Sequence, residues 1–219
     1  MPDAETTMQS YYAARAAEYD QIYQKPERQA DLQRLRLWLP TLFTDSRLFE
    51  VACGTGYWTQ VIEPLVSEIV ALDSSPETIA IAQSRAPRDK VKFLIGDAYD
   101  LPRNQGEFTS AFAGFWFSHV PKHRQREFLL GLGKILAPRA TVILLDNRYV
   151  EGSSHPITET DSEGNRYQTR KLKDGTTHRV LKNFPPETEL RSLVDGLGEA
   201  AIYTEFEYYW VFKYEAVPR

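Results

Sequence analysis

Short apolar runs alternate with helical patterns through the first two thirds of this chain of 219 residues. The runs have the length and the near-continuous hydrophobicity of strands that are buried on both faces of a sheet. They predict strands at residues 48–52, 69–72, 91–95, 110–117 and 141–145. The segments between them predict helices at residues 57–65, 122–136 and from Ser75 onward, where a cap residue precedes a proline. This alternation predicts an α/β fold in three layers.

Two amphipathic helices are expected before the first strand. The segment 8–25 is rich in alanine, and three- and four-residue spacing gives it one aromatic face. That face carries Tyr12, Ala16, Tyr19 and Tyr23. Pro26 interrupts the pattern, and residues 28–39 predict a second helix.

The pattern changes after residue 148. Residues 167–172 and 177–181 alternate between apolar and polar positions, and the turn between them contains Asp174-Gly175, which is typical of a β-hairpin. A helix is expected to begin at residues 185–187. Residues 200–207 and 209–214 predict two final strands that pair in antiparallel fashion.

Composition narrows the class of protein. The formal charge of −4 argues against a general nucleic-acid binder, which would carry a basic surplus. We expect no membrane helix and no secretory signal, because the chain has no long apolar run and no basic start before one. The single cysteine, Cys53, fits a reducing compartment. These features predict a cytoplasmic enzyme or binding domain without a metal site.

Polar groups follow the first three predicted strands at the points where those strands end. The segment 49–56 (FEVACGTG) contains an acid and a Gly-x-Gly turn, and Asp73 and Asp97 follow the next two strands. The carboxyl ends of parallel strands meet at one edge of the sheet, where open α/β folds bind cofactors. The third glycine of a dinucleotide fingerprint is missing, because Thr59 stands in its place.

The sequence EVACGTG at residues 50–56 resembles motif I of the class I S-adenosylmethionine-dependent methyltransferases, and the resemblance covers about residues 45–148. It implies a doubly wound, mostly parallel, seven-stranded sheet of the Rossmann-like methyltransferase type. It also implies S-adenosyl-L-methionine as the cofactor and S-adenosyl-L-homocysteine as the product.

The resemblance further implies a set of cofactor-binding residues. The backbone at the glycines would close on the methionine part, Asp73 would accept from the ribose hydroxyls, and Asp97 would accept from the adenine amino group. An arginine and a tyrosine of the N-terminal helix would reach the methionine carboxylate and the sulfonium. The complete set is Arg15, Tyr19, Glu50, Ala52, Gly54, Gly56, Asp73, Ser74, Asp97, Ala98 and Phe115.

The segment after the fourth strand is where this family places the wall beside the transferable methyl group. His119 is the titratable side chain of this segment and is the candidate general base. An alternative is that His119 only begins the next helix, since a nucleophile that is already ionised needs alignment and no base. The candidate substrate residues are Tyr12, Trp116, Asn147 and Arg148.

The domain organisation follows from these assignments. We expect an N-terminal helical lid at residues 1–40, a cofactor-binding core at 41–148, a hairpin insertion over the substrate pocket at 149–184, and a closing helix and strand pair at 185–219. Residues 166–182 hold six Lys and Arg residues against one acid, Asp174. This charge favours an anionic substrate, although a surface ribbon or a dimer contact would show the same surplus.

The leading hypothesis is a transfer of a methyl group from S-adenosylmethionine to a small molecule by in-line displacement. The alternatives are a non-catalytic regulatory protein that binds the same cofactor, an NAD(P)-dependent oxidoreductase, and an aminopropyl transferase of the same fold. The acceptor atom, and the choice between a monomer and a homodimer, stay open.

Overall fold

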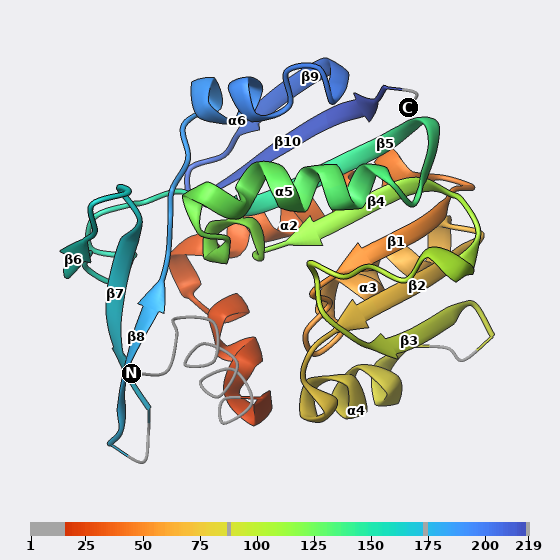
Figure 1. The fold of residues 1–219 in the computed structure, drawn as a ribbon. Coiled ribbons are helices and arrows are strands. Elements are labelled where there is room, and N and C mark those ends of the chain that lie inside the picture. Colours follow the sequence, from red (N-terminus) through yellow and green to blue (C-terminus); the bar gives the residue numbers. More distant parts are fainter. Residues whose placement is uncertain (1–15, 87–88, 173–174, 218–219) are drawn as a thin grey trace.

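Seven strands form the central sheet of the protein, which we describe from a computed structural model over residues 16–86, 89–172 and 175–217 (Figure 1). The strands are β1 (Arg47–Val51), β2 (Glu68–Asp73), β3 (Val91–Ile95), β4 (Phe108–Gly114), β5 (Leu136–Asn147), β9 (Gly198–Glu205) and β10 (Tyr209–Ala216). Their order is β3-β2-β1-β4-β5-β10-β9. The first five strands of this order are parallel, and β10 is antiparallel to both of its neighbours. The predicted fold class is therefore confirmed.

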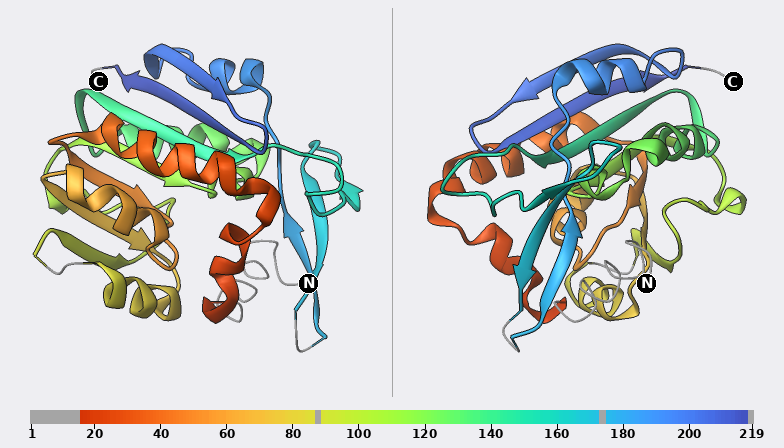
Figure 2. Two further views of the ribbon diagram at one scale, coloured as in Figure 1. Left: turned by 180° about the vertical axis from the view of Figure 1, so that it is seen from behind. Right: turned by 60° about the vertical axis from the view of Figure 1, so that its left-hand side comes forward.

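Helices cover both faces of this sheet. One face packs against α2 (Gln29–Trp38), α3 (Tyr57–Ile62) and α4 (Pro76–Arg85), and the other packs against α5 (Lys122–Gly133) and α6 (Glu187–Leu193) (Figures 1 and 2). The apolar spacing of α2 explains its position, because Leu32 and Leu35 are completely buried against the sheet. The short 3₁₀ helices are η1 (Ala16–Tyr23), η2 (Pro26–Arg28), η3 (Leu39–Phe43), η4 (Glu63–Leu65), η5 (Arg103–Gln105) and η6 (Phe117–His119).

Three predicted elements have different boundaries in the structure. The predicted α-helix at 8–25 is a 3₁₀ helix over Ala16–Tyr23, and residues 8–15 lie outside the described part. The predicted strand 110–117 ends at Gly114, because Phe115 adopts a left-handed φ of 60° that no strand can continue. The helix expected to reach residue 136 ends at Gly133, and Leu136 already belongs to β5.

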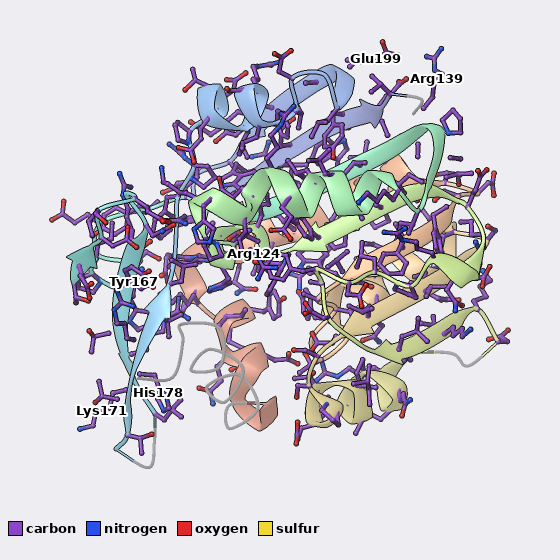
Figure 3. All side chains as sticks on the ribbon, viewed as in Figure 1. Arg124, Arg139, Tyr167, Lys171, His178 and Glu199 are labelled. Carbon is purple, nitrogen blue, oxygen red and sulfur yellow. The ribbon has the colours of Figure 1, made fainter. Side chains whose placement is uncertain are left out.

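A second, smaller sheet lies beyond the carboxyl ends of the parallel strands (Figure 1). It consists of β6 (Glu159–Thr160), β7 (Arg166–Lys171) and β8 (Thr177–Leu181), all antiparallel. The hairpin β7–β8 has a small apolar cluster of its own, which contains Tyr167, Val180 and Leu181. Figure 3 shows Tyr167 nearer the base of this hairpin and Lys171 and His178 nearer its tip. Figure 2 shows that η1 runs between the hairpin and the main sheet.

None of the helices in the described residues is both long and apolar enough to cross a membrane.

Gly56 sets how closely α4 approaches the first turn of the sheet. It begins α3 from a left-handed conformation, with φ at 75°. A Cβ atom at this position would lie 2.9 Å from the Cβ of Ala82 and 3.0 Å from its Cα, which is closer than real side chains approach. Gly56 therefore meets two constraints, one from the backbone and one from helix packing.

We expect Gly56→Ala to lower the free energy of unfolding by about 2–4 kcal/mol, because a left-handed alanine and an overpacked contact each cost about 1–2 kcal/mol. Gly152→Ala is the matched control, since Gly152 has a φ of 80° but no atom within 4 Å of an added Cβ. Urea unfolding of both variants checks this. Equal losses in the two variants would contradict the packing argument.

Candidate active site

The loop between β1 and α3 folds back on itself in a conformation that glycine favours. Ala52, Gly54 and Gly56 all have left-handed φ angles, at 53°, 56° and 75°. The backbone N–H of Gly54 donates to Oδ2 of Asp73 over 2.8 Å. The end of β2 therefore holds the glycine loop at the carboxyl end of β1.

Asp73 accepts hydrogen bonds from its own chain at both of its carboxylate oxygens. Besides Gly54, the backbone N–H of Ser75 and the hydroxyl of Thr78 donate to Oδ1 over 2.9 Å and 3.0 Å. The backbone of Ser74 adds a further hydrogen bond, so donors of the two turns surround this carboxylate. Burial raises the pKa of Asp73 above its usual value, and these hydrogen bonds oppose the shift. Ser74, which lies between Asp73 and Ser75 in the chain, is exposed.

Glu50 is a buried acid beneath the loop. Its side chain is 2% exposed, and its Oε2 accepts a hydrogen bond of 2.7 Å from the hydroxyl of Thr59. Burial, together with the negative charge of Asp73, raises the pKa of Glu50 to about 8. The acid is therefore protonated at neutral pH, and a cation beside it would stabilise the ionised form.

The turn after β3 completes the row of acids. Asp97 is exposed and accepts a hydrogen bond of 2.9 Å from the backbone N–H of Tyr99, whereas Ala98 is buried. The backbone N–H of Gly96 donates to the carbonyl of Asp73 over 3.0 Å. The structure thus brings the predicted positions at the ends of β1, β2 and β3 to one edge of the sheet.

The N-terminal segment is bonded directly to the glycine loop. The carboxylate of Asp20 accepts from the hydroxyl of Thr55 over 2.7 Å and pairs with Arg85 at 2.6 Å. The ring of Tyr23 stacks on Tyr57 with a centroid separation of 3.6 Å. These contacts hold η1 across the mouth of the loop.

Two of the predicted residues in the N-terminal segment, Tyr12 and Arg15, lie outside the described residues. Of Tyr19 the structure describes only the backbone, as part of η1.

A cavity of about 290 Å³ lies beside the glycine loop. Phe115 forms part of its wall, with its ring 5.8 Å from Tyr23 and 5.6 Å from Tyr209 between centroids. The other walls come from η1 and η2, the end of β5, the loop after it, and the hairpin. The lining residues are Gln21, Ile22, Tyr23, Lys25, Arg28, Phe115, His119, Asn147, Ser153, Ser154, His155, Gln168, Arg170, Lys182, Phe184 and Tyr209.

His119 lines this cavity and is buried. Its Nδ1 lies 2.6 Å from the carbonyl oxygen of Leu181, which can only accept, so Nδ1 carries the proton. Burial and the positive charges of Lys182 and Arg170 hold the pKa of His119 well below its usual value. The ring is therefore neutral at physiological pH, with Nε2 unprotonated.

A buried ion pair fixes the cavity wall around His119. The ammonium of Lys182 donates to Oδ1 of Asp146 over 2.9 Å and to the hydroxyl of Ser118 over 2.6 Å. The backbone N–H of Ser118 donates to Oδ2 of the same carboxylate. Burial alone would raise the pKa of Asp146, but the Lys182 ammonium holds it below the usual value. This network joins β5, η6 and the end of the hairpin.

The three described candidates for substrate contact lie in different places. Asn147 lines the cavity, and its Oδ1 accepts from Arg28 over 2.8 Å. Trp116 does not line it, because the left-handed Phe115 turns the chain and Trp116 packs on the α5 face, near Phe128 and Tyr99. That placement does not favour the predicted contact between Trp116 and a substrate.

Arg148 also lies away from the cavity lining. Its guanidinium donates to the carbonyl oxygens of Phe206 and Glu207 and pairs with Glu205 at 3.1 Å. These bonds join the end of β5 to the turn between β9 and β10. Arg148 therefore has a structural position, and its predicted contact with a substrate stays a prediction.

Several lining residues were not among the sequence-based candidates. These are chiefly Lys25, Arg28, Gln168, Arg170, Lys182 and Tyr209. The basic surplus of residues 166–182 was the available signal, and Gln168 and Arg170 do share one face of β7 by the alternation of a strand. No sequence pattern showed which face of the hairpin would line a cavity.

Known proteins share this architecture. A family model described as "Methyltransferase domain" matches residues 48–139. The structure named "DhpI-SAH complex structure" superposes with a TM-score of 0.77 and 30% identity, covering 99% of this chain and 98% of that one. The structure named "DhpI-SAM-HEP complex" gives a TM-score of 0.78 and 28% identity, with 96% and 97% coverage.

The curated proteins that match in sequence include two kinds of methyltransferase. The magnesium-protoporphyrin O-methyltransferase of Rhodobacter capsulatus is 34% identical over 86 residues, or 38% of each chain. A demethylmenaquinone methyltransferase of Staphylococcus aureus is 28% identical over 105 residues, which is 46% of this chain and 43% of the relative. The chain thus spans less than half the length of these curated relatives.

The raised pKa of Glu50 makes the stability of the protein depend on pH. The unfolded chain loses this proton as the pH rises through about 4.5, whereas the folded protein keeps it to about 8. The unfolded state therefore binds fewer protons across this window, and the Glu50 contribution to stability falls as the pH rises. We expect Glu50→Gln to be more stable than the wild type by an amount that grows from about pH 5 to a few kcal/mol at about pH 8.

Thermal unfolding of both proteins across this range measures the difference. Glu107→Gln, which alters an exposed acid, is the control. A difference between Glu50→Gln and the wild type that stays constant with pH would contradict the buried, protonated state.

Proposed function

Because this chain belongs to the class I S-adenosylmethionine-dependent methyltransferases, we propose that it transfers a methyl group from S-adenosylmethionine to a small molecule in the cavity beside Phe115. The observation that carries this proposal is the adjacency of two features. The glycine loop and its acids occupy the carboxyl ends of β1, β2 and β3, and the cavity begins at Phe115, directly after β4. A volume of about 290 Å³ suits a small acceptor.

The residues at the glycine loop fit the cofactor in charge and in hydrogen-bonding capacity. Glu50 is a buried acid with one of its two oxygens bonded to Thr59, and Asp73 is a carboxylate that can only accept from hydroxyls. We assign Glu50 to the methionine end and Asp73 to the ribose. Asp97 and Ala98, at the end of β3, are assigned to the adenine.

The remaining cofactor assignments follow the path of the loop. The backbone of Ala52, Gly54 and Gly56 closes on the methionine part, and Ser74 lies beside Asp73. Phe115 presents an aromatic face to the sulfonium, a contact worth about 0.5–2 kcal/mol. Arg15 and Tyr19 stay predictions for the N-terminal segment, and so does Tyr12 for the substrate.

S-adenosylmethionine supplies an electrophilic methyl group on a sulfonium. The chain contributes alignment, since the loop and the cavity would hold the two reactants at the short distance that an in-line displacement needs. The η1 segment, bonded to Thr55 and Arg85 through Asp20, would exclude water from the junction. A nucleophile that is ionised on binding then reacts without a base.

The first test is calorimetric titration of S-adenosylhomocysteine into the protein. We expect the wild type to bind it and Asp73→Asn to bind at least about tenfold more weakly, because one charged acceptor is lost. Asp100→Asn, which changes an exposed acid in the turn after β3, should bind as the wild type does. NADH should produce no heat. Absence of binding by the folded wild type would contradict the proposal.

His119 is proposed to orient the cavity wall and to act only secondarily as a base. Its low pKa makes the neutral ring a weak base, and its Nδ1–H is committed to the Leu181 carbonyl. His119→Asn keeps a donor near that position and removes Nε2. We expect kcat to fall by less than about tenfold, with no ionisation near neutral pH appearing or disappearing in the rate profile. A loss of about a hundredfold or more would identify His119 as the general base.

A further inference from the structure

Cationic side chains gather in the cavity. Lys25, Arg28, Arg170 and Lys182 line it, and no Asp or Glu lines it among the residues that the structure describes. Asp146, just behind the wall, neutralises Lys182 at 2.9 Å. We call Lys25, Arg28 and Arg170 the cationic cluster, and it faces the cavity with about three positive charges.

Arg28 is the strongest element of this cluster. Arg28 is only 6% exposed. Its Nε donates to the Ser153 hydroxyl over 3.0 Å and its Nη1 donates to the amide oxygen of Asn147 over 2.8 Å, and both acceptors are neutral. Its guanidinium also lies over the rings of Tyr208 and Tyr209, at 5.3 Å and 5.6 Å. Within the described residues, no carboxylate lies within ion-pair distance of it. A buried charge without a counter-ion is costly unless a ligand supplies one.

The other two cations also contact neutral oxygens. The Lys25 ammonium donates to the carbonyl of Ser153. The guanidinium of Arg170 donates to Oε1 of Gln168 through Nε at 3.2 Å and Nη2 at 2.8 Å. The nearby acid Glu27 is exposed and accepts from the Ser153 hydroxyl, so it does not line the cavity.

The neighbouring arginines affect the two lysines of the cavity. Burial and the neighbouring charges of Arg28 and Arg170 lower the pKa of Lys25. Burial also lowers the pKa of Lys182, against the attraction of Asp146, and Arg170 and Arg28 add to that shift. An anion in the cavity would favour the charged form of both lysines.

We propose that the methyl acceptor carries a compact oxyanion, a carboxylate or a phosphate-type group, which the cationic cluster holds. This rests on the proposed function, and it names the acceptor class for the same cavity. Guanidinium groups match both kinds of oxyanion through paired N–H donors. Two cations come from the segment after η1 and one from the hairpin, so the anion joins two parts of the chain that lie side by side (Figure 2).

The cluster is distinct from the residues assigned to the cofactor. Glu50, Gly54, Asp73 and Asp97 do not line the cavity, and Phe115 is the member of the cofactor set that does. Lys25 and Arg28 contact Ser153 of the loop after β5, and Arg170 belongs to the hairpin. The cationic cluster would neutralise an oxyanion at one end of the acceptor. The nucleophile of the acceptor would then face the methyl group of the cofactor.

The test uses the full protein saturated with S-adenosylhomocysteine, with inorganic phosphate, acetate and uncharged glycerol as probes in calorimetric titrations. We expect phosphate or acetate to bind and glycerol not to bind. Arg28→Met and Arg170→Met should each weaken the bound anion by at least about tenfold. Lys171→Met is the matched control, because Lys171 is the exposed neighbour of Arg170 on the outer side of the hairpin (Figure 3). It should change affinity by less than about twofold.

A second readout separates lost binding from misfolding. Arg28→Met removes an uncompensated buried charge, so it should melt no lower than the wild type without anion, and phosphate or acetate should no longer raise its melting temperature. Stronger binding of phosphate than of acetate would assign a phosphate-type group, and the reverse would assign a carboxylate.

The titrations give different results when the proposed acceptor class is wrong and when the proposed function is wrong. Loaded protein that binds neither anion would overturn the acceptor class and leave methyl transfer standing. Anion binding that S-adenosylhomocysteine displaces would assign the cluster to the cofactor carboxylate and would also overturn it. Protein that binds an anion through Arg28 but no S-adenosylhomocysteine would overturn the proposed function and keep the anion site.

Discussion

The buried pair of Asp146 and Lys182 is the interaction on which the cavity depends. Asp146 ends the fifth parallel strand, Lys182 follows the hairpin, and Ser118 of η6 bonds to both. This contact connects the main sheet to the turn that carries His119 and to the small sheet. Removal of a single partner from such a pair leaves an isolated buried charge, which costs about 3–5 kcal/mol. The end of the hairpin is therefore held to the main sheet by this buried ion pair, together with the hydrogen bond between His119 and the Leu181 carbonyl.

The sequence predicted the central sheet because buried parallel strands give continuous apolar runs, and it predicted the glycine loop because residues 50–56 carry a motif. It failed where a single backbone angle decides the outcome. The left-handed Phe115 ends β4 early and turns Trp116 to the opposite face, and no side-chain pattern encodes that angle. Arg28 was hidden for another reason. It lies in an ordinary amphipathic segment, and its partners Asn147 and Ser153 are more than a hundred residues away.

The site has opposite charges at its two ends. Asp73 and Asp97 lie at the carboxyl ends of β2 and β3, whereas the cationic cluster lines the cavity beside the hairpin. In the proposed reaction a sulfonium transfers its methyl group to an anionic acceptor, and the charges of the two reactants cancel. Negative groups on the cofactor side and positive groups on the acceptor side would stabilise both reactants as they bind. The same arrangement gathers charges of like sign within the protein, which is costly. The protonated state of Glu50 and the lowered pKa of Lys25 are two signs of that cost.

The separate apolar cluster of the hairpin bears on how such a protein can change through evolution. Tyr167, Val180 and Leu181 stabilise the hairpin from within, and Gln168 and Arg170 project from it into the cavity. Substitutions at these polar positions leave both apolar cores of the main sheet untouched. The proposed acceptor pocket can thus be altered by mutation while the main sheet keeps its stability, and proteins of one fold can diverge in substrate at little cost to folding.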